Sequence, residues 1–398
     1  MTGNIPFKNT SISIPPDYRL RLPGPTAVPQ RVRNAMSLPV LSHRGPEFRL
    51  VLSEATAMLR TVVGTKQDVF MLGSSGTGAM EAALANVLAP GDEILIVTCG
   101  QFGERFASIA EAMGAQFDRL DAPWGEAPDP LALAERLKSR AYRAVVCVHN
   151  ESSTGVVADI AAIGALLANT NTLLIVDSVS GAGGIELRMD EWGIDILVVA
   201  SQKALMCPPG LAFIAASGKA MRAIEAASAL PRFYFDLRKA KAALDKGETA
   251  FTPPISMIMA LHEALTAIHE EGLPAVLSRH RLVAAALQAG CVALGLPMFP
   301  KTPSLSATVT VAMVPEGLDG TAIVRQMYSR FHTVIAGQRT KLLGRVIRIG
   351  TMGWIGPQDV LTDLAQLEAI LRDLGYPVIA DAGTKAAQVV LARQAIAS

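Results

Sequence analysis

Short apolar segments alternate with helix-like segments through the first half of the chain. The apolar segments carry Val, Ile and Leu at consecutive positions, as strands buried on both faces of a sheet must. The segments between most of them, such as 77–89 and 102–115, carry apolar residues at helical spacing. This alternation predicts an α/β fold with a mostly parallel central sheet flanked by helices. The predicted strands are 68–73, 93–98, 143–149, 172–178, 195–201 and 211–217.

From about residue 255, apolar residues recur at helical spacing over one long segment. Residues 256–295 are strongly helical, which indicates a long connection into a second unit. Segments 306–314 and 344–353 predict two further strands, and 357–376 predicts a helix with a proline start and a glycine stop. Residues 382–398 predict a last helix.

These patterns divide the chain into three parts. Residues 1–21 are polar, contain proline and show no period, so we expect an arm that lies on another surface. Residues 22–270 form the predicted large domain. Residues 271–398 form a smaller C-terminal α/β domain.

Composition narrows the class of protein. The 398 residues carry a formal net charge of +1, which favours neither nucleic acid nor an anionic membrane as a partner. No apolar run is long enough to cross a bilayer, and the N-terminus lacks the apolar region of a secretory signal. We therefore expect a cytoplasmic protein with a large buried core.

The cysteines point away from metal and disulfide chemistry. They occur singly, without C-x-x-C pairs, which is typical of small core residues in a reducing compartment. They are Cys99, Cys147, Cys207 and Cys291.

Two ionisable residues follow neighbouring predicted strands. Lys203 lies two positions after 195–201, and Asp177 is the second-last residue of 172–178. Ligands of open α/β sheets bind at the carboxyl ends of strands, and burial makes a lysine amine nucleophilic. Lys203 alone is more typical of a surface turn, and Asp177 alone of a turn cap. Together they favour pyridoxal phosphate, whose pyridine nitrogen is kept protonated by an aspartate.

Three further segments also lie at predicted strand ends. GSSGTG (73–78) precedes a helix, so its backbone N–H groups and hydroxyls suit a phosphate, although many α/β turns look alike. Phe102, between Gly100 and Gly103, suits either stacking on a flat ring or a place in the core. The hydroxyls of HNESSTGV (149–156) suit a cofactor oxygen or a turn.

The order of these segments resembles the class V, fold-type I pyridoxal-phosphate aminotransferases. The resemblance is closest to the alanine–glyoxylate and serine–glyoxylate group, with its aspartate–glyoxylate relatives, and covers nearly the whole chain. The matching fragments are LPGPTAVP (22–29), SHRGPEF (42–48), SSGTGAMEAAL (74–84), HNESSTGV (149–156), VDSVSGAGG (176–184), RMDEWGIDI (188–196), SQKALMCPPGLA (201–212), FTPPIS (251–256) and GRVIRIGTMG (344–353).

The resemblance implies roles at matching positions. Lys203 would form the Schiff base with pyridoxal phosphate, and Asp177 would pair with the pyridine nitrogen. The residues expected to hold the phosphate are Ser75, Gly76, Thr77 and Gln202.

Four more positions complete the implied cofactor site. Ser152 would lie near the ring hydroxyl and Val179 under one ring face. Phe102 would stack on the ring, where relatives often have Trp or Tyr. Thr252 would reach the phosphate of the partner subunit, which implies a homodimer with shared active sites.

The implied reaction is ping-pong transamination. Arg348 lies in a predicted strand, and a guanidinium can hold a carboxylate bidentately; the resemblance assigns it the α-carboxylate. Arg339 would accept a distal carboxylate if its loop folds over the site, although a solvated loop fits the pattern better. The donor is predicted to be serine, alanine or aspartate, and the acceptor glyoxylate or pyruvate.

Other classes of enzyme place different demands on these residues. A cysteine desulfurase needs a nucleophilic cysteine before the carboxylate-binding arginine, and none follows Cys291. A nicotinamide dehydrogenase needs a glycine fingerprint that is missing. A pyridoxamine–pyruvate transaminase should lose the hydroxyls that SSGTG keeps. This vitamer-specific transaminase and a class V lyase of the same fold stay as alternatives.

Overall fold

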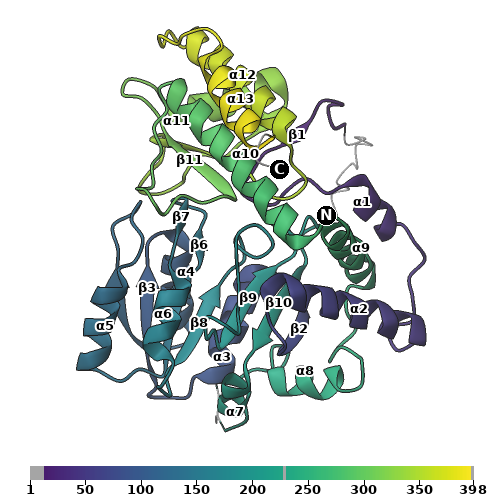
Figure 1. The fold of residues 1–398 in the computed structure, drawn as a ribbon. Helices are drawn as coiled ribbons and strands as arrows, with labels where there is room; N and C mark the ends of the chain where they lie inside the picture. The colour runs from purple at the N-terminus through teal and green to yellow at the C-terminus, as the bar shows by residue number, and fades with distance from the viewer. Residues whose placement is uncertain (1–12, 227–229, 396–398) are drawn as a thin grey trace, which may run out of the picture.

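A seven-stranded sheet forms the centre of the computed structural model, which describes residues 13–226 and 230–395 (Figure 1). Its strand order is β2-β10-β9-β8-β5-β3-β4. Only β10 runs antiparallel to its neighbours, which confirms the mostly parallel sheet. The strands are β2 Asp68–Gly73, β3 Glu93–Thr98, β4 Gln116–Asp121, β5 Ala144–Val148, β8 Leu173–Asp177, β9 Ile196–Ala200 and β10 Leu211–Ala216.

Helices cover both faces of this sheet, and alternate strand residues point to each face. In β5, Val145 and Cys147 join one buried cluster, whereas Ala144, Val146 and Val148 join the other. The first cluster includes α1 Gln30–Met36, α2 Pro46–Val63, α5 Pro130–Ser139, α6 Ile160–Leu167 and α9 Ile255–Glu271. The second includes α3 Gly76–Val87, α4 Gln101–Ala112, α7 Gly218–Ala226 and α8 Leu237–Leu244.

One sheet strand was not predicted. β4 pairs only with β3, at the edge of the sheet, and its sequence QFDRLD mixes polar with apolar positions. No position of β4 is fully buried, so it lacks the continuous apolar run by which the other strands were recognised. A short hairpin of β6 Asn150–Glu151 and β7 Val156–Val157 was also not predicted, because strands of two residues are too short to show an apolar period.

The C-terminal part has a separate core, in the upper half of Figure 1. The strongly helical segment 256–295 forms two helices, because Gly272 adopts a φ of 84° between α9 and α10. The two predicted strands pair antiparallel. The elements are α10 Leu273–Ala293, β11 Val309–Met313, α11 Gly320–Phe331, β12 Thr333–Val334, β13 Val346–Gly350, α12 Pro357–Asp373 and α13 Ala382–Ala395.

The end of the predicted arm is attached to this C-terminal part. β1 Arg19–Leu20 pairs in parallel with β12. Asp363 forms ion pairs with Arg19 at 3.0 Å and with Arg21 at 2.7 Å. Residues 1–12 of the arm and 396–398 of the predicted last helix lie outside the described residues. The domain boundaries at 21/22 and 270/271 stay predictions.

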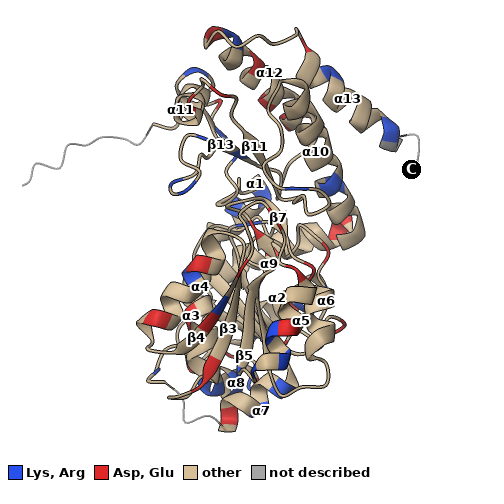
Figure 2. Ribbon diagram, turned by 90° about the vertical axis from the view of Figure 1, so that its left-hand side faces the viewer, with Lys and Arg blue, Asp and Glu red and all other residues tan. Residues whose placement is uncertain are grey.

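The placement of the cysteines and of the charged residues agrees with the expectations drawn from composition. All four cysteines are free and buried, as expected of core residues. Figure 2 shows acidic and basic residues interspersed over both halves of the molecule. In the part of the chain that the structure describes, no helix is both long and apolar enough to cross a bilayer.

Candidate active site

The candidate site lies where the carboxyl ends of the parallel strands meet. Asp177 ends β8, and Lys203 follows β9, the strand beside it. The turn after β2 begins α3, and the turn after β3 begins α4. A single cavity is lined by residues of all four segments, together with Gly24 and Pro25 from the N-terminal loop.

Lys203 is buried at the carboxyl ends of these strands. Its side chain is 7% exposed, and Nζ donates a hydrogen bond of 2.5 Å to the carbonyl oxygen of Pro23. Burial lowers the pKa of Lys203 to about 8, because the charged form loses its hydration. A substantial fraction of the amine is therefore neutral, and nucleophilic, near physiological pH.

Asp177 lines the same cavity. Its side chain is buried, and Oδ1 accepts a hydrogen bond of 2.7 Å from the backbone N–H of Val179. Burial raises the pKa of Asp177 to about 6, against the opposing effects of that hydrogen bond and of Lys203. The carboxylate lacks a side-chain hydrogen-bond donor among the described residues, so a cationic ligand would stabilise its charged form.

The predicted phosphate residues come together at the start of α3. Ser75 is the N-cap, and its hydroxyl accepts from Gly78 N at 3.3 Å. Thr77 Oγ1 accepts from Arg105 Nη1 at 3.1 Å, which leaves the hydroxyl proton free to donate. Gln202 Oε1 is buried without a hydrogen-bond partner in the described part of the chain. The first N–H groups of α3, the Thr77 hydroxyl and the amide N–H groups of Gln202 are donors that suit an anion.

Phe102 and Val179 contribute apolar walls to this cavity. The Phe102 ring centroid lies 5.9 Å from Lys203 Nζ and 4.7 Å from the guanidinium carbon of Arg105. A Cβ on Gly76 would lie 3.0 Å from Val179 Cγ2, so the glycine provides room for the valine. The space between these walls suits a flat ring.

Arg348, Arg339 and Ser152 line a second, adjoining cavity that Lys203 and Phe102 also border. Arg348, in β13, donates to Gly337 O at 2.9 Å and to Ser152 O at 3.0 Å. Among the described residues no carboxylate pairs with Arg348 or with Arg339. Both guanidinium groups can therefore bind an anionic ligand.

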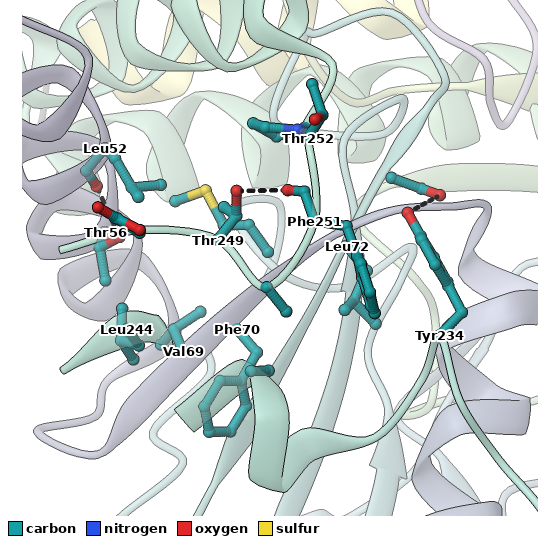
Figure 3. A pocket seen from close by; sticks show the side chains of 16 residues that line it. Leu52, Thr56, Val69, Phe70, Leu72, Tyr234, Leu244, Thr249, Phe251 and Thr252 are labelled. Carbon is teal, nitrogen blue, oxygen red and sulfur yellow. Dashed lines mark hydrogen bonds between the residues drawn. The ribbon is translucent and has the colours of Figure 1, made fainter. Parts of the chain in front are cut away.

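Thr252 is not brought together with Lys203 in this chain. It borders another cavity, at the β2 edge of the sheet, beside Phe251, Leu72 and Tyr234 (Figure 3). Its predicted contact with a partner subunit stays a prediction. Lys341, the other cation of the Arg339 loop, lies 4.9 Å from the Trp124 ring and 3.9 Å from Glu104.

Sequence reasoning missed three contributors to the site. Gly24 adopts a φ of 107°, and a Cβ there would come within 2.5 Å of the Lys203 amine. Arg105 lines both cavities, and Glu151 is a fully buried carboxylate beside them. Glu151 was part of a fragment singled out for its hydroxyls, and Arg105 lies three residues after Phe102, one helical turn away.

The comparisons with known proteins agree with this geometry. The aminotransferase class-V model matches residues 24–350. The chain is 38% identical over 377 residues to a protein named soluble hydrogenase, small subunit, from Synechococcus sp., covering 94% of this chain and 98% of that one. It is 37% identical over 374 residues to L-aspartate–glyoxylate aminotransferase of Paracoccus denitrificans, covering 92% and 94%.

A solved structure extends the similarity to three dimensions. Ureidoglycine–glyoxylate aminotransferase from Bacillus subtilis matches with a TM-score of 0.91 and 33% identity, over 96% of this chain and 99% of that one. The chain therefore belongs to the class-V aminotransferases. Within them it falls into the serine-, alanine- and aspartate–glyoxylate aminotransferase group, which confirms the resemblance and the fold class.

Proposed function

We propose that the protein transfers the amino group of a small L-amino acid to glyoxylate or pyruvate, with pyridoxal phosphate bound at Lys203. The observation that carries the proposal is the pair of buried, oppositely charged groups at the ends of β8 and β9. Asp177 and Lys203 border one cavity, and that cavity also contains the anion cradle at the start of α3.

The residues present fit this cofactor. A phosphate suits the N-terminus of α3, where the first backbone N–H groups and the Thr77 hydroxyl can donate. Gln202, whose side-chain amide carries two N–H donors, borders the same cavity. In the same cavity, Asp177 suits a protonated pyridine nitrogen. Four residues, Ser75, Gly76, Thr77 and Gln202, would hold the phosphate. Phe102 and Val179 would flank the ring, and Ser152 would lie near its hydroxyl.

The chemistry divides between the cofactor and the chain. Pyridoxal phosphate supplies an aldehyde that accepts the amino group and a protonated ring that withdraws electrons from the substrate α-carbon. Asp177 holds the proton on the ring nitrogen. Lys203 Nζ, partly neutral because of its burial, would hold the cofactor through its aldehyde carbon and, as a free amine, would move the proton at the substrate α-carbon.

The substrate would be oriented from the second cavity. Arg348 would bind the α-carboxylate, because two backbone carbonyls fix its guanidinium and leave donors free. Arg339 would take a distal carboxylate when the donor is aspartate. Thr252 of the partner subunit would complete the phosphate site, so the working unit would be a homodimer.

A half-reaction tests the proposal. The protein is loaded with pyridoxal phosphate and mixed with serine, alanine or aspartate in the absence of an acceptor. We expect release of one equivalent of keto acid per subunit, followed by turnover when glyoxylate or pyruvate is added. Comparing kcat/KM across the three donors and two acceptors then identifies the substrate pair. Failure of every donor to release keto acid would contradict the proposal.

The role of Arg348 has its own variant. Arg348→Gln should raise KM for the amino donor by about 10- to 100-fold, which corresponds to losing a charged hydrogen-bond pair. The affinity for pyridoxal phosphate should change little, because Arg348 borders the second cavity and not the anion cradle. An unchanged KM would remove Arg348 from the substrate site.

A further inference from the structure

Glu151 is a buried carboxylate that the proposed chemistry leaves without a role. It ends the short strand β6, and its side chain is 0% exposed. An ionised carboxylate in such a place is unfavourable unless hydrogen bonds compensate for its lost hydration. Its partners therefore indicate what the residue does.

Two of those partners are backbone N–H groups in the first turn of α4. Glu151 Oε2 accepts from Phe102 N at 2.9 Å and from Gly103 N at 3.2 Å. The first N–H groups of a helix have no partner within the helix, and a carboxylate is stabilised at that end. The side chain thus binds the backbone of Phe102, whose ring borders the cavity of Lys203.

The other oxygen of Glu151 is held by the neighbouring serine. Oε1 accepts from the Ser153 backbone N–H at 3.1 Å and from its hydroxyl at 2.6 Å. The same hydroxyl accepts from Gln101 N at 2.9 Å. The turn after β6 and the start of α4 are therefore joined through the Glu151 carboxylate and the Ser153 hydroxyl.

The turn after β6 also contacts two residues of the second cavity, where the substrate is proposed to bind. The carbonyl of Ser152, which follows Glu151, accepts from Arg348 Nη1 at 3.0 Å. The carbonyl of Ser153 accepts from Gln338 Nε2 at 3.2 Å. Glu151 thus lies between the element that carries Phe102 and the turn that receives Arg348.

Gly100 provides the space for this arrangement. Its φ of 171° is extended backbone that any residue adopts, so its backbone conformation does not require glycine. A Cβ on Gly100, however, would lie 2.4 Å from Glu151 Cγ and 2.5 Å from Ser153 Oγ. Any larger residue there would displace the carboxylate or the serine.

We propose that Glu151 is a positioning residue, which holds the Phe102 ring in place over the cofactor site by binding the first turn of α4. This inference rests on the proposed function, because the ring matters only if a flat cofactor binds beside it. It predicts that the effect of removing the Glu151 charge on cofactor affinity depends on the presence of the Phe102 ring.

A double-mutant cycle tests the inference with pyridoxamine phosphate as the probe. This ligand lacks the aldehyde, so its affinity reports the cavity without a bond to Lys203. Glu151→Gln should weaken binding on the order of tenfold, as expected for weakened hydrogen bonds to a charged group. In a Phe102→Ala background the same substitution should weaken binding less than about twofold, because the ring it positions is gone. The circular dichroism of the bound probe should change with Glu151→Gln.

Asp195→Asn is the matched control. Asp195 is also a buried carboxylate that accepts from a backbone N–H, Leu174 N at 3.0 Å, and from a serine hydroxyl, Ser217 Oγ at 2.7 Å. It lies just before β9, at the amino end of that strand, whereas the site lies at the carboxyl ends. We expect Asp195→Asn to leave the probe affinity unchanged in both backgrounds, which separates positioning from general loss of stability.

Two gentler changes keep the test decisive if Glu151→Gln does not fold. Ser153→Ala removes one hydrogen bond to the carboxylate, and Gly100→Ala crowds it; both should weaken probe binding in the same Phe102-dependent way. Equal losses with and without the Phe102 ring would overturn the inference, as would wild-type affinity in these variants. A parent protein that does not bind the probe would instead overturn the proposed function.

Discussion

The Asp177 carboxylate is destabilised in the folded chain by its burial. Its pKa of about 6 lies above the ordinary value of 3.8, so the folded state holds this proton more tightly than the unfolded state. Stability of the cofactor-free protein should therefore fall as the pH rises from about 4 to 6, and the loss is complete above that window. A cationic ring nitrogen would relieve this cost.

Asp177→Asn tests that account at one residue. Asparagine does not titrate and can still accept from Val179 N, so the cofactor-free variant should be more stable than its parent at pH 7, by roughly 1–3 kcal/mol. The difference should shrink toward pH 4, and amino transfer should fall about a hundredfold or more, since the ring proton is no longer held. Urea denaturation at both pH values measures the difference. A variant less stable than its parent at pH 7 would contradict it.

Which site residues could be predicted depended on where the chain places them. Lys203, Asp177 and Phe102 follow strand ends, and strand ends are recognisable from apolar runs. Glu151 and Gly24 act through contacts between distant segments. The carbonyl that binds Lys203 belongs to Pro23, 180 positions earlier, and no local pattern indicates such a contact.

Among the helices, α6 shows how closely a helix can approach a neighbouring backbone. Gly164 lies within α6, and a Cβ there would be 1.8 Å from the carbonyl oxygen of Trp192. That distance is far inside van der Waals contact, so the helix or the Trp192 loop would have to move. Glycine is thus required at this position for space, although it lowers helix propensity.

Gly164→Ala should therefore destabilise the protein by about 1–3 kcal/mol, as overpacking of a tight contact does. In open space the same change in a helix stabilises by roughly 0.5–1 kcal/mol. Gly218→Ala in α7 is the control, because its nearest neighbour is the flexible end of Arg222 at 3.5 Å. Thermal unfolding compares the two, and a rise in Tm for Gly164→Ala would show that the loop yields easily.

Elements were predictable where burial was uniform. β3, β5, β8, β9 and β10 were recognised because nearly every position is apolar and buried. The edge strand β2 was recognised because it carries the apolar run VFML. β4 was not predicted because none of its positions is fully buried, so polar residues are tolerated along its whole length. The division of this helical segment into α9 and α10 at Gly272 was not predicted, because two consecutive helices have the same spacing of apolar residues as one helix.

At the scale of the whole molecule, Thr252 and Lys203 border different cavities of the same chain. The proposed homodimer explains this separation, since Thr252 would serve the site of the other subunit. The shared site between two subunits could be predicted from the sequence only because the chain resembles a known family. No hydrophobic pattern along one chain can indicate which surfaces of two chains meet.

Mixing two variants tests the shared site. Lys203→Ala removes the covalent anchor, and Thr252→Val should weaken pyridoxal phosphate binding on the order of tenfold. If Thr252 acts across the interface, a mixed dimer contains one site with both native residues and one with neither. Activity at limiting pyridoxal phosphate should then recover after the two variants are unfolded and refolded together. No recovery in confirmed mixed dimers would place Thr252 outside the partner's site.

The covalent attachment of pyridoxal phosphate is the central claim, and borohydride reduction followed by peptide mass mapping tests it most directly. The purified protein is incubated with pyridoxal phosphate, reduced and digested. We predict one stable adduct per subunit, on Lys203, and its absence in Lys203→Arg. An adduct confined to a different lysine, or no adduct in the parent protein, would contradict the account.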